Sequence, residues 1–534
     1  MGAKLWNVLI HMAADNNLKE ECIYELNEIL KLGDLSSFDV IAQFDSGSTV
    51  TRYDFRVAPA AAAPASPAKE ELIAPPVLPP STSERDLDDI AFVTLADREL
   101  LQRIPDSAVI HDFLEVFARK DAFNFMSLSG HGSGAVGEFL PSDNPPSALS
   151  IRSLKANVIV LAARQCRNGK IDILGLDSCL MSMVETCYEL QSQVGILIGA
   201  EGFEQNAGWP YHEILKELQD HPSLSPAELA KLVVRKYIRN YAPYYASGIS
   251  VDLSACDLQA EKLSQLTVSL KNLVALLREQ LPVPQFASAI VLAHWQAQSY
   301  KFEQYTDLWD FCSLLKSSLE LGIFNIPAER IEARKNIEDA CRDVMDAIDN
   351  IVLATDYHGA AFQHSHGLSV YFPWSKSELA KTIGTYNELT FATETGWDDF
   401  LVDYVTFTQR EVRDDENQAE EKISPMGMAP KGRSPVKLPR KTPHRVSPAL
   451  DTRVSPALDT RVSPALDTRV SPAIDTRVSP AIDTRVSPPL DTRVSPAIDT
   501  RGKLAFSPDV KNPPTEFYRS KKSANDPYPP QTAE

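Results

Sequence analysis

Two apolar runs, each ending in a short polar turn, decide the fold. Residues 123–134 read FNFMSLSGHGSG, and residues 171–179 read IDILGLDSC. Each begins with a nearly continuous apolar run of strand length, which indicates a strand buried on both faces. Such strands are typical of mostly parallel sheets covered by helices, so the sequence predicts an α/β fold with α/β/α layers. In these sheets the working residues lie beyond the carboxyl ends of the strands, where His131 and Cys179 fall.

The strand-and-helix alternation covers residues 1–220, which we predict to form one core domain. Further strand-like runs occur at 6–12 and 38–44. An Ala/Pro-rich stretch at 58–82 is predicted to be a disordered surface insertion. Residues 221–409 have mainly helical spacing and are predicted to form an extension packed on the core.

The last part of the chain, residues 410–534, is rich in proline and serine and has no apolar periodicity. Within it, residues 445–500 repeat the octapeptide RVSPALDT seven times with small changes. A period of eight matches none of the repeats that stack into a core. With a proline and two charges in each unit, this tail is predicted to be extended and disordered.

The charge distribution argues against binding to nucleic acid. The whole chain carries a net charge of −19. Residues 424–534 contain 18 Lys and Arg against 11 Asp and Glu, a net +7, which leaves −26 for the rest of the chain. An acidic body repels phosphate backbones, so nucleic acid is not a predicted partner.

The cellular location is predicted from the termini and the cysteines. We find no secretory signal and no apolar run near the ~20 residues that span a bilayer, so neither export nor a membrane contact is predicted. Seven cysteines without CxxC pairs indicate neither a zinc site nor a disulfide framework. Free thiols suit a reducing compartment, and the prediction is therefore cytoplasmic.

Cys179 and His131 have the residue types of a thiol-based catalyst. A thiol attacks a carbonyl as thiolate, and the leaving amine needs a proton donor. Cys179 precedes an expected helix at 180–190, whose first N–H groups would favour a thiolate. The backbone N–H groups of Gly132 and Cys179 are candidates for an oxyanion hole. The alternative is that His131 is only a turn residue and Cys179 only core packing.

These residues resemble a known family. GHGSG at 130–134 and LDSCLM at 176–181 resemble the histidine and cysteine motifs of the clostripain family, a relative of caspases, legumain, gingipain and separase. The resemblance covers nearly all of residues 4–406 and includes GWPY at 208–211 and WDDFL at 397–401. It implies a caspase-like fold and hydrolysis of peptide bonds, with Cys179 and His131 as nucleophile and general acid/base.

The resemblance also implies a substrate preference. Asp177 matches a family acid near the pocket for the residue before the scissile bond, which favours Arg or Lys. Relatives often read EPGDGW where this chain reads EQNAGW at 204–209, so one aspartate is missing. Glu201 or Glu204 could replace it. The alternative for Asp177 is that it merely caps the following helix.

No cofactor is predicted. Some relatives use calcium, but this sequence has no Asp/Asn-rich calcium loop. His358, His364 and His366 have no acidic or thiolate partners at fixed spacing, so no metal site is predicted. Relatives often cut themselves between the histidine and the cysteine, but residues 137–150 contain no Arg or Lys.

Three functions remain open at this point. The first is a cysteine endopeptidase acting on proteins or peptides. The second is a catalytically silent scaffold that presents the tail to partner proteins, and the third is an acyltransferase or ligase with the same dyad. The tail itself is interpreted as a spacer or docking array. Its Arg every eight residues would alternatively make it a substrate of its own enzyme.

Overall fold

A nine-stranded sheet forms the centre of the described part of the chain. This computed structural model describes residues 4–33, 35–47, 49–56, 92–97, 106–143, 146–243, 249–300 and 304–408. The predicted insertion at 58–82 and the tail at 410–534 lie outside the described residues.

Five neighbouring strands in the middle of the sheet are parallel, in the order β9-β8-β5-β1-β2. They are β1 (Trp6–Ala13), β2 (Asp39–Asp45), β5 (Phe123–Ser129), β8 (Ile171–Asp177) and β9 (Val194–Gly199). All five are largely buried, as the continuous apolar runs predict.

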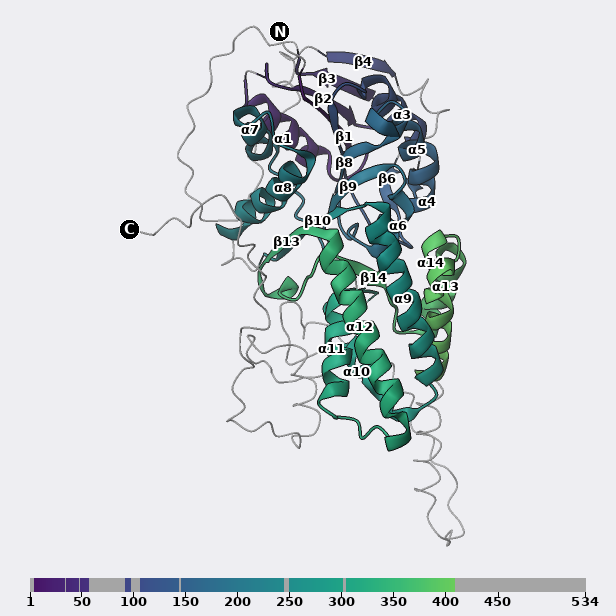
Figure 1. Cartoon of the computed structure of the whole chain (residues 1–534). Coiled ribbons are helices and arrows are strands. Elements are labelled where there is room, and N and C mark those ends of the chain that lie inside the picture. The colour runs from purple at the N-terminus through teal and green to yellow at the C-terminus, as the bar shows by residue number, and fades with distance from the viewer. Residues whose placement is uncertain are drawn as a thin grey trace, which may run out of the picture. The chain divides into compact units, whose positions relative to one another are not determined.

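Antiparallel strands extend the sheet on both sides. Beyond β2 come β3 (Thr49–Asp54) and β4 (Phe92–Asp97), and beyond β9 come β10 (Val251–Asp257) and β13 (Val352–His358). Residues after 220 therefore supply two strands of the same sheet (Figure 1).

Helices cover both faces of the sheet because successive strand side chains point to opposite sides. Val8 and Ile10 belong to one core cluster, whereas Leu9 belongs to the other. The first cluster is covered by α1 (Lys19–Leu30), α7 (Tyr211–Asp220) and α8 (Pro226–Tyr241). The second is covered by α3 (Asp106–Phe117), α4 (Ile151–Leu154), α5 (Val160–Ala163) and α6 (Val184–Leu190). The predicted α/β/α sandwich is confirmed.

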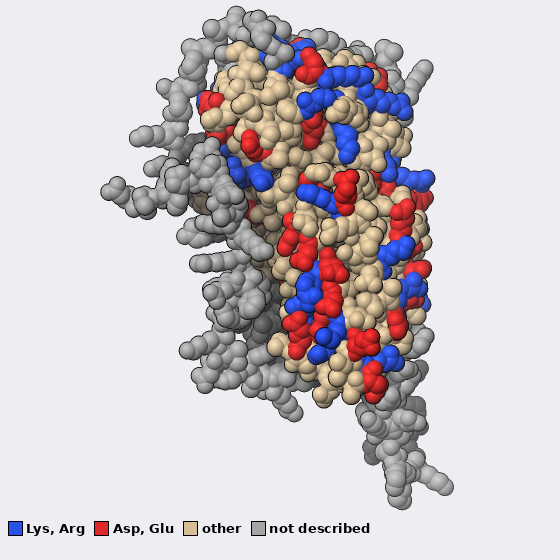
Figure 2. Space-filling model, in the orientation of Figure 1, with Lys and Arg blue, Asp and Glu red and all other residues tan. Residues whose placement is uncertain are grey.

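A group of long helices continues the second core cluster. It contains α9 (Ala260–Gln280), α10 (Pro284–Gln296), α11 (Leu308–Glu320) and α12 (Ile331–Ile351) (Figure 1). On the face shown in Figure 2, basic and acidic side chains are interspersed over these helices and form no patch of one sign.

Beside these helices lies a small sheet with the strand order β11-β12-β14. Its strands are β11 (Ser299–Tyr300), β12 (Tyr305–Asp307) and β14 (Ser369–Tyr371), and the chain then forms α13 (Lys376–Tyr386), α14 (Thr390–Thr395) and a helix over 397–408. Helix α11 begins at Leu308, where the Asp307 carboxylate caps it by accepting from the Asp310 N–H at 2.7 Å.

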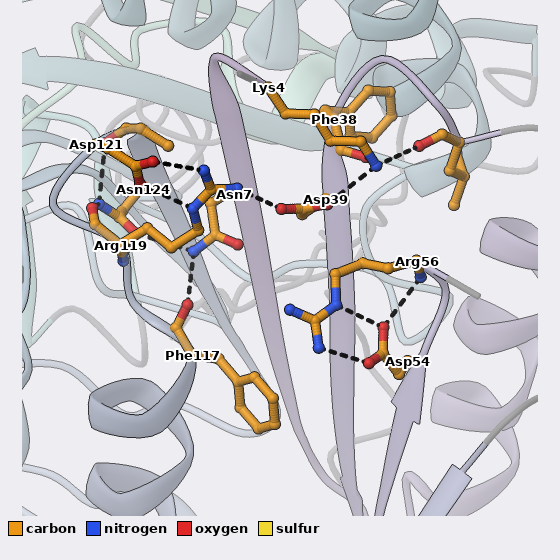
Figure 3. Close-up of polar contacts among 12 residues, drawn as sticks. Lys4, Asn7, Phe38, Asp39, Asp54, Arg56, Phe117, Arg119, Asp121 and Asn124 are labelled. Carbon is orange, nitrogen blue, oxygen red and sulfur yellow. Dashed lines mark hydrogen bonds and ion pairs between the residues drawn. The ribbon is translucent and has the colours of Figure 1, made fainter. Parts of the chain in front are cut away.

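A network of ion pairs lies at the amino ends of the parallel strands (Figure 3). The Asp39 carboxylate, at the start of β2, pairs with Lys4 at 3.0 Å and also with Arg119. Arg119 in turn donates two hydrogen bonds to Asp121, at 3.0 and 2.9 Å. This region, which we call the amino-end network, consists of Lys4, Asp39, Arg119 and Asp121, together with the neighbouring pair Asp54–Arg56.

Among the described residues, no helix is both long enough and apolar enough to cross a membrane.

Candidate active site

His131 and Cys179 lie beyond the carboxyl ends of two neighbouring parallel strands. Ser129 at the end of β5 pairs with Asp177 at the end of β8, so each candidate residue follows two positions later. The two turns touch. A Cβ atom on Gly132 would lie 2.5 Å from the Cys179 carbonyl oxygen, so only glycine allows this approach. The prediction that His131 and Cys179 meet at this edge agrees with a pocket that both of them line.

Cys179 is the only one of the seven cysteines that is not fully buried, and all seven are free thiols. Its Sγ accepts a hydrogen bond from the Glu204 backbone N–H at 3.3 Å. Burial raises the pKa of the Cys179 thiol, and the Glu204 N–H opposes this shift.

The expected helix at 180–190 is wrong in its start, because α6 begins only at Val184. Leu180 takes a left-handed conformation with φ of 65°, and Met183 is extended and bridges to Ser369. The first N–H groups of α6 therefore do not surround Cys179. The prediction that they favour a Cys179 thiolate is wrong. A left-handed leucine costs about 1–2 kcal/mol. Its N–H is held by the Gly202 carbonyl at 2.9 Å.

His131 is half-buried, and its Nε2 lies 2.8 Å from the side-chain oxygen of Asn17. An amide oxygen only accepts, so Nε2 carries the proton and Nδ1 is left as the base. Burial lowers the pKa of His131, while Glu21 and Asp143 partly oppose the shift. The imidazole is therefore neutral near pH 7 and ready to take a proton. Sequence reasoning missed Asn17, because nothing in its spacing links it to His131.

The turn that carries His131 is fixed by the hairpin that follows it and by a tyrosine far away in the sequence. A hairpin of β6 (Phe139–Asp143) and β7 (Pro146–Leu149) follows it, and the Leu140 N–H donates to the His131 carbonyl at 2.9 Å. From β12, the Tyr305 hydroxyl donates to the Ser133 carbonyl at 2.7 Å.

A pocket of about 360 Å³ of empty volume, part of it open to solvent, adjoins Cys179 and His131. Four acidic residues line it: Glu21 and Glu25 of α1, Asp177 of β8 and Glu204 after β9. Glu21 is half-buried, whereas Glu25, Asp177 and Glu204 interact with one another and are called the three pocket acids below. The remaining lining residues are Leu18, Cys22, Ser129, Gly130, Ser178, Gln205, Asn206 and Gly208.

Asp177 is buried on the pocket wall. Its Oδ2 accepts from the Tyr211 hydroxyl at 2.9 Å and from the Trp209 N–H at 3.4 Å. Burial raises the pKa of Asp177 to about 6, although hydrogen bonds from Glu204 and Tyr211 oppose the shift. Asp177 is therefore the most easily ionised of the three pocket acids, since burial raises the pKa of both Glu25 and Glu204 well above the usual range.

The structure separates the two glutamates that the sequence offered as substitutes. Glu204 lines the pocket, and its Oε2 accepts from the Trp209 indole N–H at 3.4 Å. Glu201 does not line it, because its side chain turns to the Gly367 N–H and lies beside Asp252 and Asp307. Burial and these two acids raise the pKa of Glu201 well above its usual range. Glu201 is thus a buried structural carboxyl.

Among the described residues, no group of three or more His, Cys, Asp or Glu side chains has the arrangement of a metal site. His366, one of the three clustered histidines, instead lies 3.4 Å from the Asp307 carboxylate and stacks on Trp309.

The fold and this site define a class of protein, the α/β/α cysteine peptidases. A family model described as the clostripain family matches residues 105–404, more than half of the chain. The protein belongs to the clostripain family of cysteine peptidases. Curated proteins gave no match.

Solved structures of this family cover 74% of the chain with low identity. One is a secreted C11 cysteine protease from Bacteroides thetaiotaomicron bound to an irreversible peptide inhibitor, with 15% identity, 99% of that chain covered and a TM-score of 0.49. Another is an inactive zymogen C11 protease from Parabacteroides distasonis, with 15% identity, 99% of that chain covered and a TM-score of 0.46.

Proposed function

We propose that this peptidase cleaves proteins or peptides internally, after Arg or Lys, using Cys179 as nucleophile and His131 as general acid/base. The observation that carries the proposal is the shared pocket. It contains the candidate nucleophile and base together with buried carboxyl groups that attract a cationic side chain.

The reaction follows from the two side chains. His131 Nδ1 takes the proton of the Cys179 thiol as sulfur attacks the peptide carbonyl carbon. The N–H groups of Gly132 and Cys179 would stabilise the resulting oxyanion. As the C–N bond breaks, His131 returns the proton to the leaving amine and a thioester remains. Water then attacks with its proton passing to His131, the C–S bond breaks, and the thiol recovers its proton.

Asn17 supports this cycle by fixing the imidazole. Its side-chain oxygen holds Nε2–H, so Nδ1 remains the unprotonated nitrogen. Asn17 does not exchange protons in the reaction, and we regard it as a positioning residue.

The silent-scaffold alternative is disfavoured by family membership together with the presence of both His131 and Cys179.

A panel of fluorogenic peptides ending in Arg, Lys, Asp, Asn or Leu tests the proposed peptidase activity and its specificity. We expect hydrolysis of the Arg and Lys peptides that disappears in Cys179→Ala and persists in the control Cys166→Ala, which changes a buried thiol outside the pocket. If a peptide ending in Asp, Asn or Leu were cleaved instead, and its cleavage required Cys179, the proposed preference for Arg or Lys would be wrong. Accumulation of transferred or ligated product would indicate the acyltransferase function instead.

We also propose a reducing, cytoplasmic location. The seven cysteines are free, although Cys187 lies within hydrogen-bonding reach of Cys256, and Cys312 within reach of Cys341. Neighbouring thiols that stay unpaired favour a compartment with reducing agents. Disulfides found by mass spectrometry in the natural protein would contradict this location.

For the tail, we propose that residues 445–500 bind partner proteins through their repeated Ser-Pro units. Seven similar copies favour many weak contacts over one tight contact. Mass spectrometry of the full chain after storage separates this role from self-cleavage. Cuts after the repeat arginines in the parent, but not in Cys179→Ala, would make the tail a substrate.

A further inference from the structure

Glu25, on helix α1, brings a third carboxyl group to the pocket. Its side chain is only 2% exposed, and it accepts hydrogen bonds from the Ser129 hydroxyl at 3.1 and 3.3 Å. The segment around Gly208 leaves room for it. Gly208 has a φ of 65°, and a Cβ atom there would lie 3.1 Å from the carboxyl carbon of Glu25. Any side chain at position 208 would therefore press on Glu25.

The three pocket acids are held together without a compensating cation. Asp177 is hydrogen-bonded to Glu25 on one side and to Glu204 on the other, and each interaction favours a proton on the glutamate. Among the described residues, no Lys or Arg forms an ion pair with any of the three. Negative charges in hydrogen-bonding contact repel one another and so disfavour ionisation. Burying the three acids therefore costs folding free energy, unless a cationic ligand binds them.

One further polar atom at the pocket indicates that a polar group of a ligand belongs there. The Ser178 hydroxyl, on a residue that is 2% exposed, has no hydrogen-bond partner among the described residues. Ser178 lines the pocket beside Cys179. Buried polar atoms are normally paired, so this hydroxyl indicates an absent partner that enters from the substrate side.

We propose that Glu25 is a specificity-determining residue that binds, with Asp177 and Glu204, the guanidinium group of an arginine before the scissile bond. This inference rests on the proposed function and extends it. A guanidinium carries five N–H donors in a planar fork, whereas an ammonium carries three on a point charge. Three carboxyl groups around one pocket match the larger donor set, so the site prefers Arg to Lys.

The test compares Glu25→Gln with the parent on three peptides that differ only before the scissile bond, with Arg, Lys or citrulline. Citrulline has the shape of arginine without the charge. We expect kcat/KM for the Arg peptide to fall by about 10- to 100-fold, and the value for citrulline to change far less. The matched control is Glu28→Gln on the same helix, which removes a buried glutamate paired to Lys31 at 2.6 Å and outside the pocket.

The outcomes separate this inference from the proposed function. A parent enzyme that cleaves citrulline as well as Arg would remove the proposed Arg/Lys specificity. A parent that prefers Arg, with a Glu25→Gln variant that loses Arg and citrulline cleavage equally, would overturn the role of Glu25 alone.

Folding is checked by thermal unfolding of each variant. Glu25→Gln is expected to keep or raise the unfolding temperature, because it removes one of three crowded buried acids. If it unfolds instead, Glu25→Asp is used, which keeps a carboxylate on a shorter side chain. Retained preference for Arg over citrulline, reduced in degree, supports the inference, and an equal loss on both peptides overturns it.

Discussion

Acidic residues lie at both ends of the parallel strands, but they have basic partners at only one end. At the amino ends, Asp39 and Asp121 are each paired with a lysine or an arginine (Figure 3). At the carboxyl ends, Glu25, Asp177 and Glu204 share a pocket without a basic partner among the described residues.

The pKa shifts have opposite signs at the two ends. Hydrogen bonds from Arg119 lower the pKa of Asp121. Burial raises the pKa of Asp177 to about 6 and that of the nearby Asp252 to about 7. Paired acids stabilise the fold in their charged form, whereas unpaired buried acids oppose it at neutral pH. We infer that the amino-end network serves stability and that the carboxyl-end acids serve a ligand.

The largest expected effect is at the reacting atom. Cys179→Ala should lower kcat by about 10³-fold or more, because no other thiol is exposed at the pocket to replace it. Its unfolding temperature should stay close to that of the parent. Residual hydrolysis is measured with purified protein and a fluorogenic Arg peptide. A variant that remains fully active would require another nucleophile.

The next effect concerns the pocket charge. Asp177→Asn should lower kcat/KM for an Arg peptide by about 10²-fold, since the removed charge is buried and hydrogen-bonded. Asp121→Asn, at the opposite end, should leave kcat/KM unchanged. If both variants lose activity to a similar extent, the functional difference between the two ends does not hold.

The pH dependence of stability should also differ between the two ends. Asp177 has a raised pKa in the folded state, so the stability linked to its proton is present below pH 4 and is lost as the pH rises through about 6. Replacing it by Asn should therefore improve the free energy of unfolding at pH 7.5, relative to pH 4, by about 3 kcal/mol compared with the parent. Asp121→Asn should leave this difference nearly unchanged, because Asp121 is exposed and its lowered pKa keeps it ionised at both pH values. Urea unfolding at both pH values measures the difference.

The smallest expected effect tests the amino-end network alone. Arg119→Met removes the partner of Asp39 and Asp121 and should cost about 1–2 kcal/mol of unfolding free energy. The kcat/KM for an Arg peptide should remain within error of the parent value. Loss of activity in a folded variant would show that the two ends are coupled.

Sequence patterns predicted the framework of the site because buried parallel strands have a strong local signal. The runs before His131 and Cys179 are the strands β5 and β8, and their adjacency brought both residues to one edge. The helix after Cys179 was predicted four residues too early, since Met183 is kept extended by a contact with Ser369, far away in the sequence. No local pattern reports such a contact.

The specificity pocket was only partly visible in the sequence. Glu201 and Glu204 are three residues apart in an irregular segment, and only the structure shows which one faces the pocket. Glu25 lies in an ordinary amphipathic helix, where a glutamate is expected to face solvent.

The hydroxyl of Tyr305 holds the carbonyl of Ser133, so the histidine turn depends on a residue synthesised about 170 positions later. During translation, a chain that already includes Cys179 lacks this tether, and it also lacks β10 and β13 of the sheet. We therefore expect the histidine turn to be held less firmly until Tyr305 has been synthesised, and a chain that ends before Tyr305 to hydrolyse peptides more slowly than the full chain.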